Sequence, residues 1–319
     1  MTWRSKTNLR AGAVLATLLV ATVAKAQSGS ETASLFGQLS QLNTGVTAFN
    51  NTACGPTAVA NGLIFLNNSY GGNLFQNYNP NSYTTVNDLA SVMGTGAGGT
   101  SYGTANPSLV SGLYSYIGAS GLNPAPQVSI AGGQYIVGNG ASIPGAIAGS
   151  FANVIPTAQA MANWLNANDA VEFMIQWGTY GGVGGTNWTA DGNQHFVTLT
   201  SLSLSGGDGT INFWDPWGNG TSGASVTAQL QSAFVTTVGG YLYLTGIAGT
   251  DPEASLSESG TDSGDGMPLM ASAPSGRIVA DLAEAAVPEP GILALAALGG
   301  AWLLVGSRRK TRANLAAQP

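Results

Sequence analysis

The chain has 319 residues and a formal net charge of −6, and only 8% of its residues are charged. Between Lys25 and Arg277 it contains no lysine or arginine. Nucleic acids and polyanionic surfaces are bound by basic side chains, so this composition excludes a nucleic-acid partner for that segment.

Residues 1–27 have the features of a secretory signal peptide. A basic start is followed by an apolar run over residues 11–24 and by Ala24-Lys25-Ala26-Gln27, which has the small residues of a cleavage site. An uncleaved membrane anchor is the alternative, but the apolar run is short for a membrane span. We therefore expect an exported protein whose mature form begins near Gln27 or Ser28.

The first half of the remaining chain is predicted to be mainly helical. Residues 28–50 are polar, and one short helix is expected near Glu31–Leu42. An apolar run of helical length follows Pro56, a residue that suits the first turn of a helix because its missing N–H has no acceptor there. Start and cap signals predict further helices over residues 85–93, 107–117 and 157–165.

The second half changes to the patterns of strands. Strands are expected over residues 170–178, 194–204, 210–214 and 240–247, each bounded by Gly, Asn or Asp. A short helix is expected over residues 226–234. A helical half followed by an antiparallel sheet is an α+β domain, here residues 28–250. Residues 251–286 are rich in Ser, Gly, Asp, Ala and Pro, which predicts a disordered stalk.

Residues 287–319 carry a second terminal signal. The triplet Pro288, Glu289 and Pro290 precedes an apolar stretch that ends at Val305, and three basic residues follow at positions 308–310. This pattern closely resembles the PEP-CTERM sorting signal. The resemblance implies transient anchoring in the inner membrane of a Gram-negative bacterium, removal of the tail by an exosortase, and a final location at the cell surface or in the extracellular matrix. A permanent C-terminal anchor is the alternative.

The chain contains one cysteine and one histidine. Cys54 stands at the head of the apolar helical run, His195 lies in an expected strand, and Asp215 ends the next strand. Helix N-termini and neighbouring imidazolium groups both stabilise thiolates. The pattern therefore predicts Cys54 as nucleophile, His195 as base and Asp215 as the acid that orients the imidazole. It predicts no metal site, since one Cys and one His lack a further soft ligand at short spacing.

Three motifs together resemble the papain-like C39 peptidases and the related secreted immunoglobulin-cleaving cysteine proteases of streptococci. They are Cys-Gly-Pro-Thr-Ala from Cys54, Gln-His-Phe-Val-Thr-Leu around His195 and Phe-Trp-Asp-Pro-Trp-Gly around Asp215. The resemblance covers the order of elements from about Thr52 to Ile247. It implies a papain-like fold and a cofactor-free hydrolase that cleaves peptide or protein substrates, with the catalytic roles given above.

One feature of these families has no counterpart here. They place a Gln or a Lys six to ten residues before the cysteine as an oxyanion donor, whereas positions 44 and 48 of this chain are Thr and Ala. Asn50, Asn51 and Gln41 are the alternative amide donors.

A non-enzymatic reading stays open beside the catalytic one. An unpaired cysteine in an exported protein can be a buried apolar residue, and Asp before Pro is a common turn former at strand ends. On that reading the same fold serves a cell-surface or exopolysaccharide-matrix protein.

Overall fold

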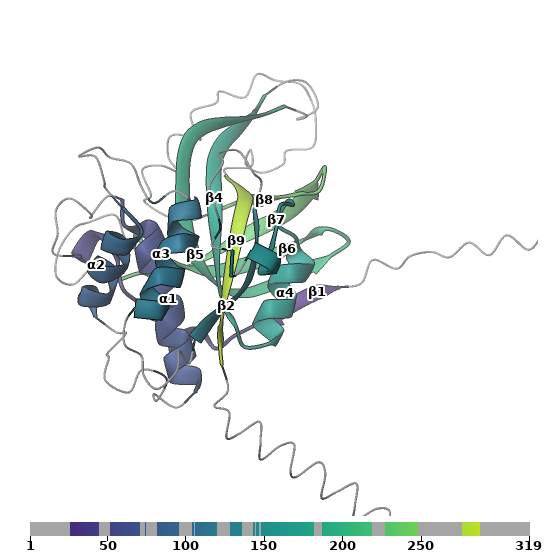
Figure 1. Cartoon of the computed structure of the whole chain (residues 1–319). Coiled ribbons are helices and arrows are strands. Elements are labelled where there is room, and N and C mark those ends of the chain that lie inside the picture. Colours follow the sequence, from purple (N-terminus) through teal and green to yellow (C-terminus); the bar gives the residue numbers. More distant parts are fainter. Residues whose placement is uncertain are drawn as a thin grey trace, which may run out of the picture.

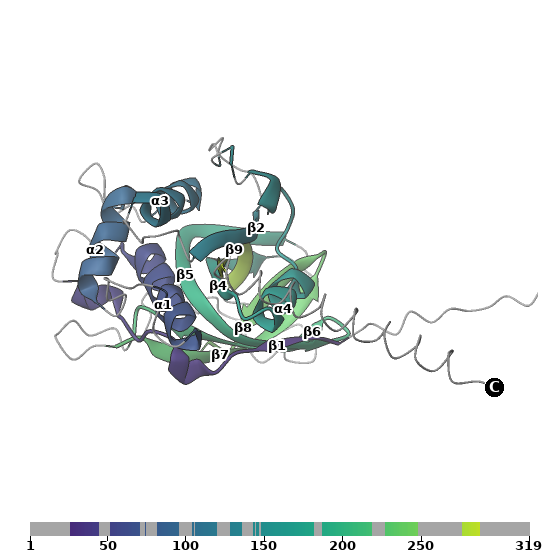
Figure 2. The same cartoon turned by 60° about the horizontal axis from the view of Figure 1, so that its bottom comes forward.

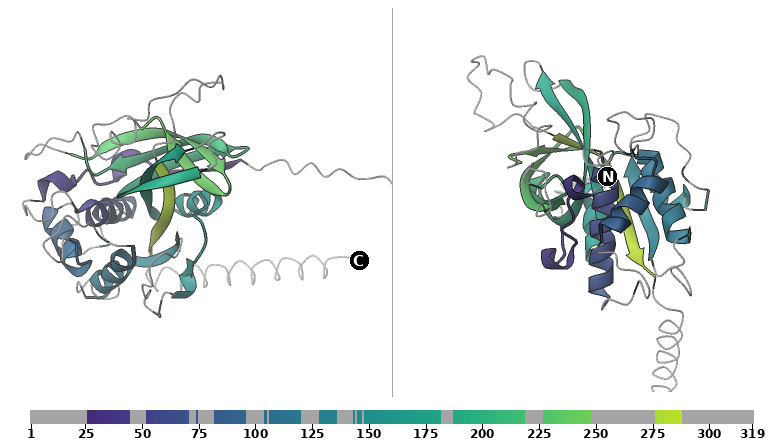
Figure 3. Two further views of the ribbon diagram at one scale, coloured as in Figure 1. Left: turned by 90° about the horizontal axis from the view of Figure 1, so that it is seen from above. Right: turned by 90° about the vertical axis from the view of Figure 1, so that its left-hand side faces the viewer.

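The computed structural model describes residues 26–44, 52–70, 74, 82–95, 104, 106–119, 128–135, 143, 145–146, 148–181, 187–218, 227–247 and 276–287. Within these residues the protein is a mixed α+β structure, which confirms the predicted fold class at that level. Three of the helices, α1, α2 and α3, lie together on one side of a large sheet, as Figures 1 and 3 show.

The described α-helices are close to those expected from the sequence. They are α1 (Cys54–Ser69), α2 (Tyr83–Val92), α3 (Asn106–Ala119) and α4 (Ala158–Asn166). The hydroxyl of Thr157 accepts a hydrogen bond from the N–H of Ala160 and caps α4. The single helix expected near residues 31–42 is wrong: that segment contains two 3-10 turns, η1 (Ala33–Leu35) and η2 (Gln41–Asn43). A further 3-10 turn, η3 (Ala148–Ser150), precedes α4.

Six antiparallel strands close into a ring. They are β4 (Ala170–Gly181), β5 (Asn187–Ser205), β6 (Asp208–Asp215), β7 (Gln229–Val238), β8 (Tyr241–Thr245) and β9 (Gly276–Ala286). Each pairs with the next, and β4 also pairs with β9, so the sheet returns to its start (Figure 2). Outside the ring, β1 (Gln27–Ser30) pairs with β5, β2 (Val128–Tyr135) pairs with β9, and β3 (Phe151–Ala152) pairs with β2.

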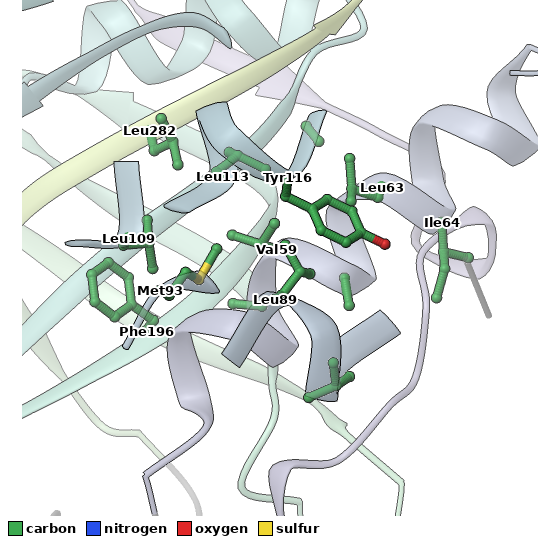
Figure 4. Packing of buried hydrophobic residues seen from close by; sticks show 14 of the residues in the cluster. Val59, Leu63, Ile64, Leu89, Met93, Leu109, Leu113, Tyr116, Phe196 and Leu282 are labelled. Atoms are coloured by element: carbon green, nitrogen blue, oxygen red, sulfur yellow. The ribbon is translucent and has the colours of Figure 1, made fainter. Parts of the chain in front are cut away.

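Two apolar cores hold these layers together. The first lies between the helices and the sheet, where Val59 and Leu63 of α1 meet Leu113 of α3 and Leu282 of β9 (Figure 4). The second fills the ring of strands and includes Phe173 and Phe213, whose rings pack edge to face with centroids 5.5 Å apart. The first core fixes α1 against β4, β5 and β9.

Two predictions in the second half of the chain are wrong. Residues 229–238, inside the expected helix and beyond it, form strand β7. The last eleven residues of the predicted disordered stalk form β9, and the rest of that segment, residues 251–275, lies outside the described residues. Composition suggested a polar tail, but β9 is almost wholly buried between β4 on one edge and β2 and β8 on the other. The fold therefore extends past residue 250.

Strand β9 also brings a basic side chain into the fold, which a domain of residues 28–250 would lack. The guanidinium of Arg277 lies 5.5 Å from the centre of the Trp188 ring and 4.5 Å from that of Tyr241. It also donates a hydrogen bond of 2.6 Å to Oε1 of Gln176. This cation–π arrangement joins four strands at the start of β9.

Candidate active site

The N-terminus of α1 carries Cys54 as its first residue. Ala53 is the N-cap, and its methyl side chain has no oxygen that could accept a hydrogen bond from the first N–H groups of the helix. Pro56 lies in the first turn, as expected, and the N–H of Thr57 donates to the carbonyl of Ala53 at 2.9 Å. The thiol thus stands beside backbone donors that can face an anion.

Strand β5 is fastened to the first turns of α1. The hydroxyl of Thr198 donates a buried hydrogen bond of 2.9 Å to the carbonyl of Ala58. Gly55 permits the close approach of α3, because a Cβ there would lie 2.6 Å from Leu109, and Phe196 of β5 also lies near this position, 3.4 Å from such a Cβ. His195 comes directly before Phe196 and is therefore held at the start of α1.

The end of β6 orients Asp215. The chain turns at Pro216-Trp217-Gly218, where Gly218 has φ +69°, a conformation that favours glycine. The N–H of Trp217 donates to Oδ1 of Asp215 at 2.8 Å, and the N–H of Gly218 donates to the Asp215 carbonyl at 3.2 Å. This turn therefore orients the carboxylate of Asp215 independently of its contact with His195.

The three residues predicted from the sequence meet at one point. Nε2 of His195 lies 2.8 Å from Oδ1 of Asp215. Cys54 lies beside His195, close enough to raise the pKa of the imidazole. Because Asp215 occupies Nε2, the ring nitrogen that faces Cys54 is Nδ1. The exposed fractions of Cys54, His195 and Asp215 are 7%, 2% and 4%, so the cluster is almost closed to solvent.

The charge state of His195 follows from these neighbours. Burial by itself lowers the pKa of this imidazole, but the adjacent Asp215 carboxylate and the hydrogen bonds to Asp215 and Cys54 raise the pKa well above its usual value. An imidazolium is therefore favoured at neutral pH. Such a group can donate a proton on one side while the carboxylate holds it on the other.

Of the amide side chains considered as oxyanion donors, the structure places Gln41 near the cluster. The backbone N–H of Gln41 donates to the carbonyl of Pro216 at 2.8 Å, and the hydroxyl of Ser40 donates to the same carbonyl at 2.9 Å. Gln41 is 1% exposed, and its Oε1 has no hydrogen-bond partner among the described residues. Asn50 and Asn51 lie outside the described residues.

A segment for which the sequence predicted only polar residues and one short helix supports the site. We call residues 31–44 the N-terminal strap. Asn61 of α1 binds it through two buried hydrogen bonds, one from the N–H of Leu39 at 2.9 Å and one to the carbonyl of Leu39 at 3.1 Å. The indole N–H of Trp214 donates to the carbonyl of Ala33 at 3.1 Å. The strap therefore ties α1 to the end of β6. The polar Asn61 within an apolar run was the only sequence signal for it.

Other kinds of site find no support in the described residues. No group of three or more His, Cys, Asp or Glu residues among them is arranged to hold a metal ion, and Cys54 forms no disulfide. None of the described helices is long and apolar enough to cross a membrane. The terminal segments, with the sorting residues Pro288, Glu289 and Pro290, lie outside the described residues.

Comparisons with protein-family models, with curated proteins and with solved structures found no match to this chain.

Proposed function

We propose that the protein is an exported cysteine peptidase with a papain-like arrangement of Cys54, His195 and Asp215. The observation that carries the proposal is the position of His195, which forms a hydrogen bond of 2.8 Å with Asp215 and has Cys54 as a close neighbour that raises its pKa. A helix that carries the thiol and adjoining strands that carry the imidazole and the carboxylate support the same reading. The resemblance of the three sequence motifs supports it independently.

The proposed reaction uses each group once in each half-cycle. The Cys54 thiolate attacks the carbonyl carbon of a peptide bond, and His195 donates its Nδ1 proton to the departing amine. A water molecule then attacks the thioester while His195 accepts its proton, which releases the acid and restores the thiolate. Asp215 stays ionised and keeps the imidazole in position.

The developing oxyanion needs donors near the thiol. The first N–H groups of α1, including that of Cys54, are suited to this role because the N-cap residue Ala53 has no side-chain acceptor for them. Gln41 is the side-chain candidate that lies within the described residues, and its backbone N–H is hydrogen-bonded to the turn that follows Asp215. Its assignment is part of the proposal.

A second candidate function is a non-enzymatic surface or matrix protein. The observation that favours it is burial, because none of the three side chains is more than 7% exposed. A buried Cys–His–Asp cluster would then be a stabilising polar network in the core. On this reading Cys54 contributes packing and not reactivity.

Export and sorting complete the proposal. The signal peptide of residues 1–27 directs the chain across the inner membrane, and the segment of residues 287–319 is the substrate of an exosortase-type enzyme. β9 ends at Ala286, and Val287 is exposed. The proposed processing site therefore begins directly where the folded strand ends, and removal of the tail leaves the sheet intact.

The decisive experiment is a peptide-library screen with residues 28–287, compared with the variants Cys54→Ala and His195→Ala. Cleavage by the wild type that both variants lose supports the peptidase. Iodoacetamide labelling of Cys54 at mildly acidic pH gives a second readout, because a reactive thiolate labels fast and an inert core thiol labels slowly. No cleavage on broad peptide and ester panels, together with slow labelling, would sink the enzyme proposal.

A further inference from the structure

Two glutamates lie fully buried in the sheet beneath α1. Glu172 is on β4 and Glu284 is on β9, and both are 0% exposed. In the pairing of these strands Ala170 lies opposite Glu284, and Glu172 lies opposite Leu282. The two glutamates are therefore diagonal neighbours on one face of the sheet, which is a distance that long side chains bridge.

Helix α1 packs directly on this pair. Gly62 of α1 faces Glu172 so closely that a Cβ at Gly62 would collide with Oε1 of that carboxyl. Residues 54–69 of α1 contain no charged side chain. The helix that begins with Cys54 thus covers the carboxyl pair with apolar and backbone atoms, and contributes no cation to it.

The other elements around the pair contribute almost only acids. Asp169 precedes β4, Glu31 follows β1, and Asp281 lies on β9 three residues before Glu284. The ionisable residues in the sequence of β5 are Asp191, a further acid, and His195, which is already paired with Asp215. On β2 the ionisable residue is Tyr135. Arg277 lies at the far end of β9, packed on Trp188 and Tyr241.

The hydrogen bonding of the pair requires a proton. No hydrogen bond from another described residue reaches any of the four carboxyl oxygens. As diagonal neighbours on one face of the sheet, the two carboxyls are nevertheless close enough to interact with each other. Two carboxylates cannot bond to each other, and two buried negative charges without a cation are strongly unfavourable. One proton between the two groups removes a charge and supplies the missing donor.

The protonation equilibria agree with this geometry. Burial, followed by repulsion from Glu284 and the hydrogen bond to it, raises the pKa of Glu172 well above its usual value. Burial is also the main reason that the pKa of Glu284 is raised, to about 7. The negative charge of Asp169 also raises the pKa of Glu284.

We propose that Glu172 and Glu284 share a proton and form a pH-sensitive latch, which holds β9 and α1 against β4 when protonated and loosens them when the last proton leaves. The device concerns the stability of the C-terminal strand and of the helix that carries Cys54. It is independent of whether Cys54 is catalytic. The latch loosens as the pH rises through the folded pKa values, because the negative charge created by deprotonation has no neighbouring cation to balance it.

The direction of the pH effect is set by linkage. A carboxyl whose pKa is raised on folding binds more protons in the native state than in the unfolded state. Its contribution to stability is fully present below the ordinary glutamate value of 4.5 and is lost as the pH rises through the folded value, which is about 7 for Glu284 and well above the ordinary value for Glu172.

The test compares the melting temperature between about pH 5 and pH 8 for the wild type and for E172Q/E284Q. Two amides keep the shape and can hydrogen-bond to each other, but they do not titrate. The wild type should lose about 5 °C or more of melting temperature over this range that the double variant keeps. A matched control is D88N/D208N, which removes two exposed carboxyls and should follow the wild type. Equal losses in the wild type and in E172Q/E284Q overturn the latch.

A second measurement uses the wild-type protein and so does not depend on the folding of a variant. With glutamate ¹³C-labelled at Cδ, the resonances of Glu172 and Glu284 should titrate well above the ordinary glutamate range. Glu31, whose pKa is also raised to about 7, is identified by E31Q. Hydrogen exchange should speed up together in α1, β4 and β9 as the pair deprotonates, beyond the intrinsic change with pH. Ordinary titration of both resonances overturns the proposal, whatever the outcome of activity assays.

Discussion

Nε2 of His195 lies 2.8 Å from Oδ1 of Asp215, and the same carboxylate oxygen also accepts the N–H of Trp217 at 2.8 Å. The carboxylate is thus oriented by its own turn and the imidazole by the carboxylate. Since both residues are nearly excluded from water, this ion pair is little screened. The ring is fixed with its other nitrogen towards Cys54.

We expect His195 to titrate well above its ordinary value of 6.5. The stability that the ion pair contributes is fully present below that pH and is lost as the pH rises through the folded value. His195 is the only histidine, so its ring resonances are unambiguous in an NMR titration. Asp215→Asn should lower the midpoint, because it removes the negative charge. A wild-type midpoint at or below the ordinary value contradicts the assignment of the ion pair.

The three site residues should differ in what their loss costs. Cys54→Ala should abolish hydrolysis and change the free energy of unfolding by no more than about 1 kcal/mol. His195→Ala should lower kcat by about 10²-fold or more, and Asp215→Ala should cost less, because Asp215 orients the base and transfers no proton. Turnover and urea denaturation of the same variants check this. A large loss of stability in Cys54→Ala, with no activity to lose, favours the surface-protein function.

The N-terminal strap should depend on Asn61. Asn61→Ala leaves a buried N–H and a buried carbonyl of Leu39 without their partners, so the free energy of unfolding should fall by about 2–4 kcal/mol. The matched control is Asn68→Ala on the same helix. Its amide donates to the carbonyl of Leu35 at 2.7 Å on the exposed surface, so its loss should cost about 1 kcal/mol or less. Equal costs in urea denaturation would show that the strap is not held from the core.

Strand β9 should be required for folding. A chain of residues 28–287 should give a cooperative thermal transition, whereas residues 28–275 should not. Without β9 the ring of strands opens, and the edges of β2 and β4 lose their partner. Circular dichroism and calorimetry of the two proteins check this. A cooperatively folded 28–275 protein would restore residue 250 as the end of the domain.

Processing should produce a mature chain that begins near Gln27 or Ser28 and ends near residues 288–290. Cleavage there leaves β1 and β9 with the folded domain, since these strands begin at Gln27 and end at Ala286. Intact mass spectrometry of the native protein from its source membrane or medium checks both ends. Retention of residues 291–319 would indicate a permanent anchor.

Local sequence patterns were sufficient to predict those helices and strands whose conformation depends mainly on their own residues. The apolar run after Cys54, the helix over residues 157–165 and the strand beginning at Ala170 were predicted from local patterns, and α1, α4 and β4 lie there. Residues 226–234 were misread because their alternation is unusual. Gln231 and Ala233 point to the interior, while Leu230 and Phe234 are 50% and 66% exposed. The Ser, Gly, Asp, Ala and Pro content of residues 251–286 suggested a disordered stalk, whereas in β9 burial raises the pKa of Asp281 and Glu284 and so favours their protonated forms.

The sequence by itself determined that the chain is α+β and that Cys54, His195 and Asp215 are its candidate chemical groups, and it predicts the two terminal signals. These follow from composition, periodicity and residue type, which are local properties. Only the tertiary structure decided that the three groups meet, that the N-terminal strap ties α1 to the turn after Asp215, and that β9 closes the ring of strands. Such contacts join residues far apart in the chain, and they form because burial favours one packing of helices and strands over the others.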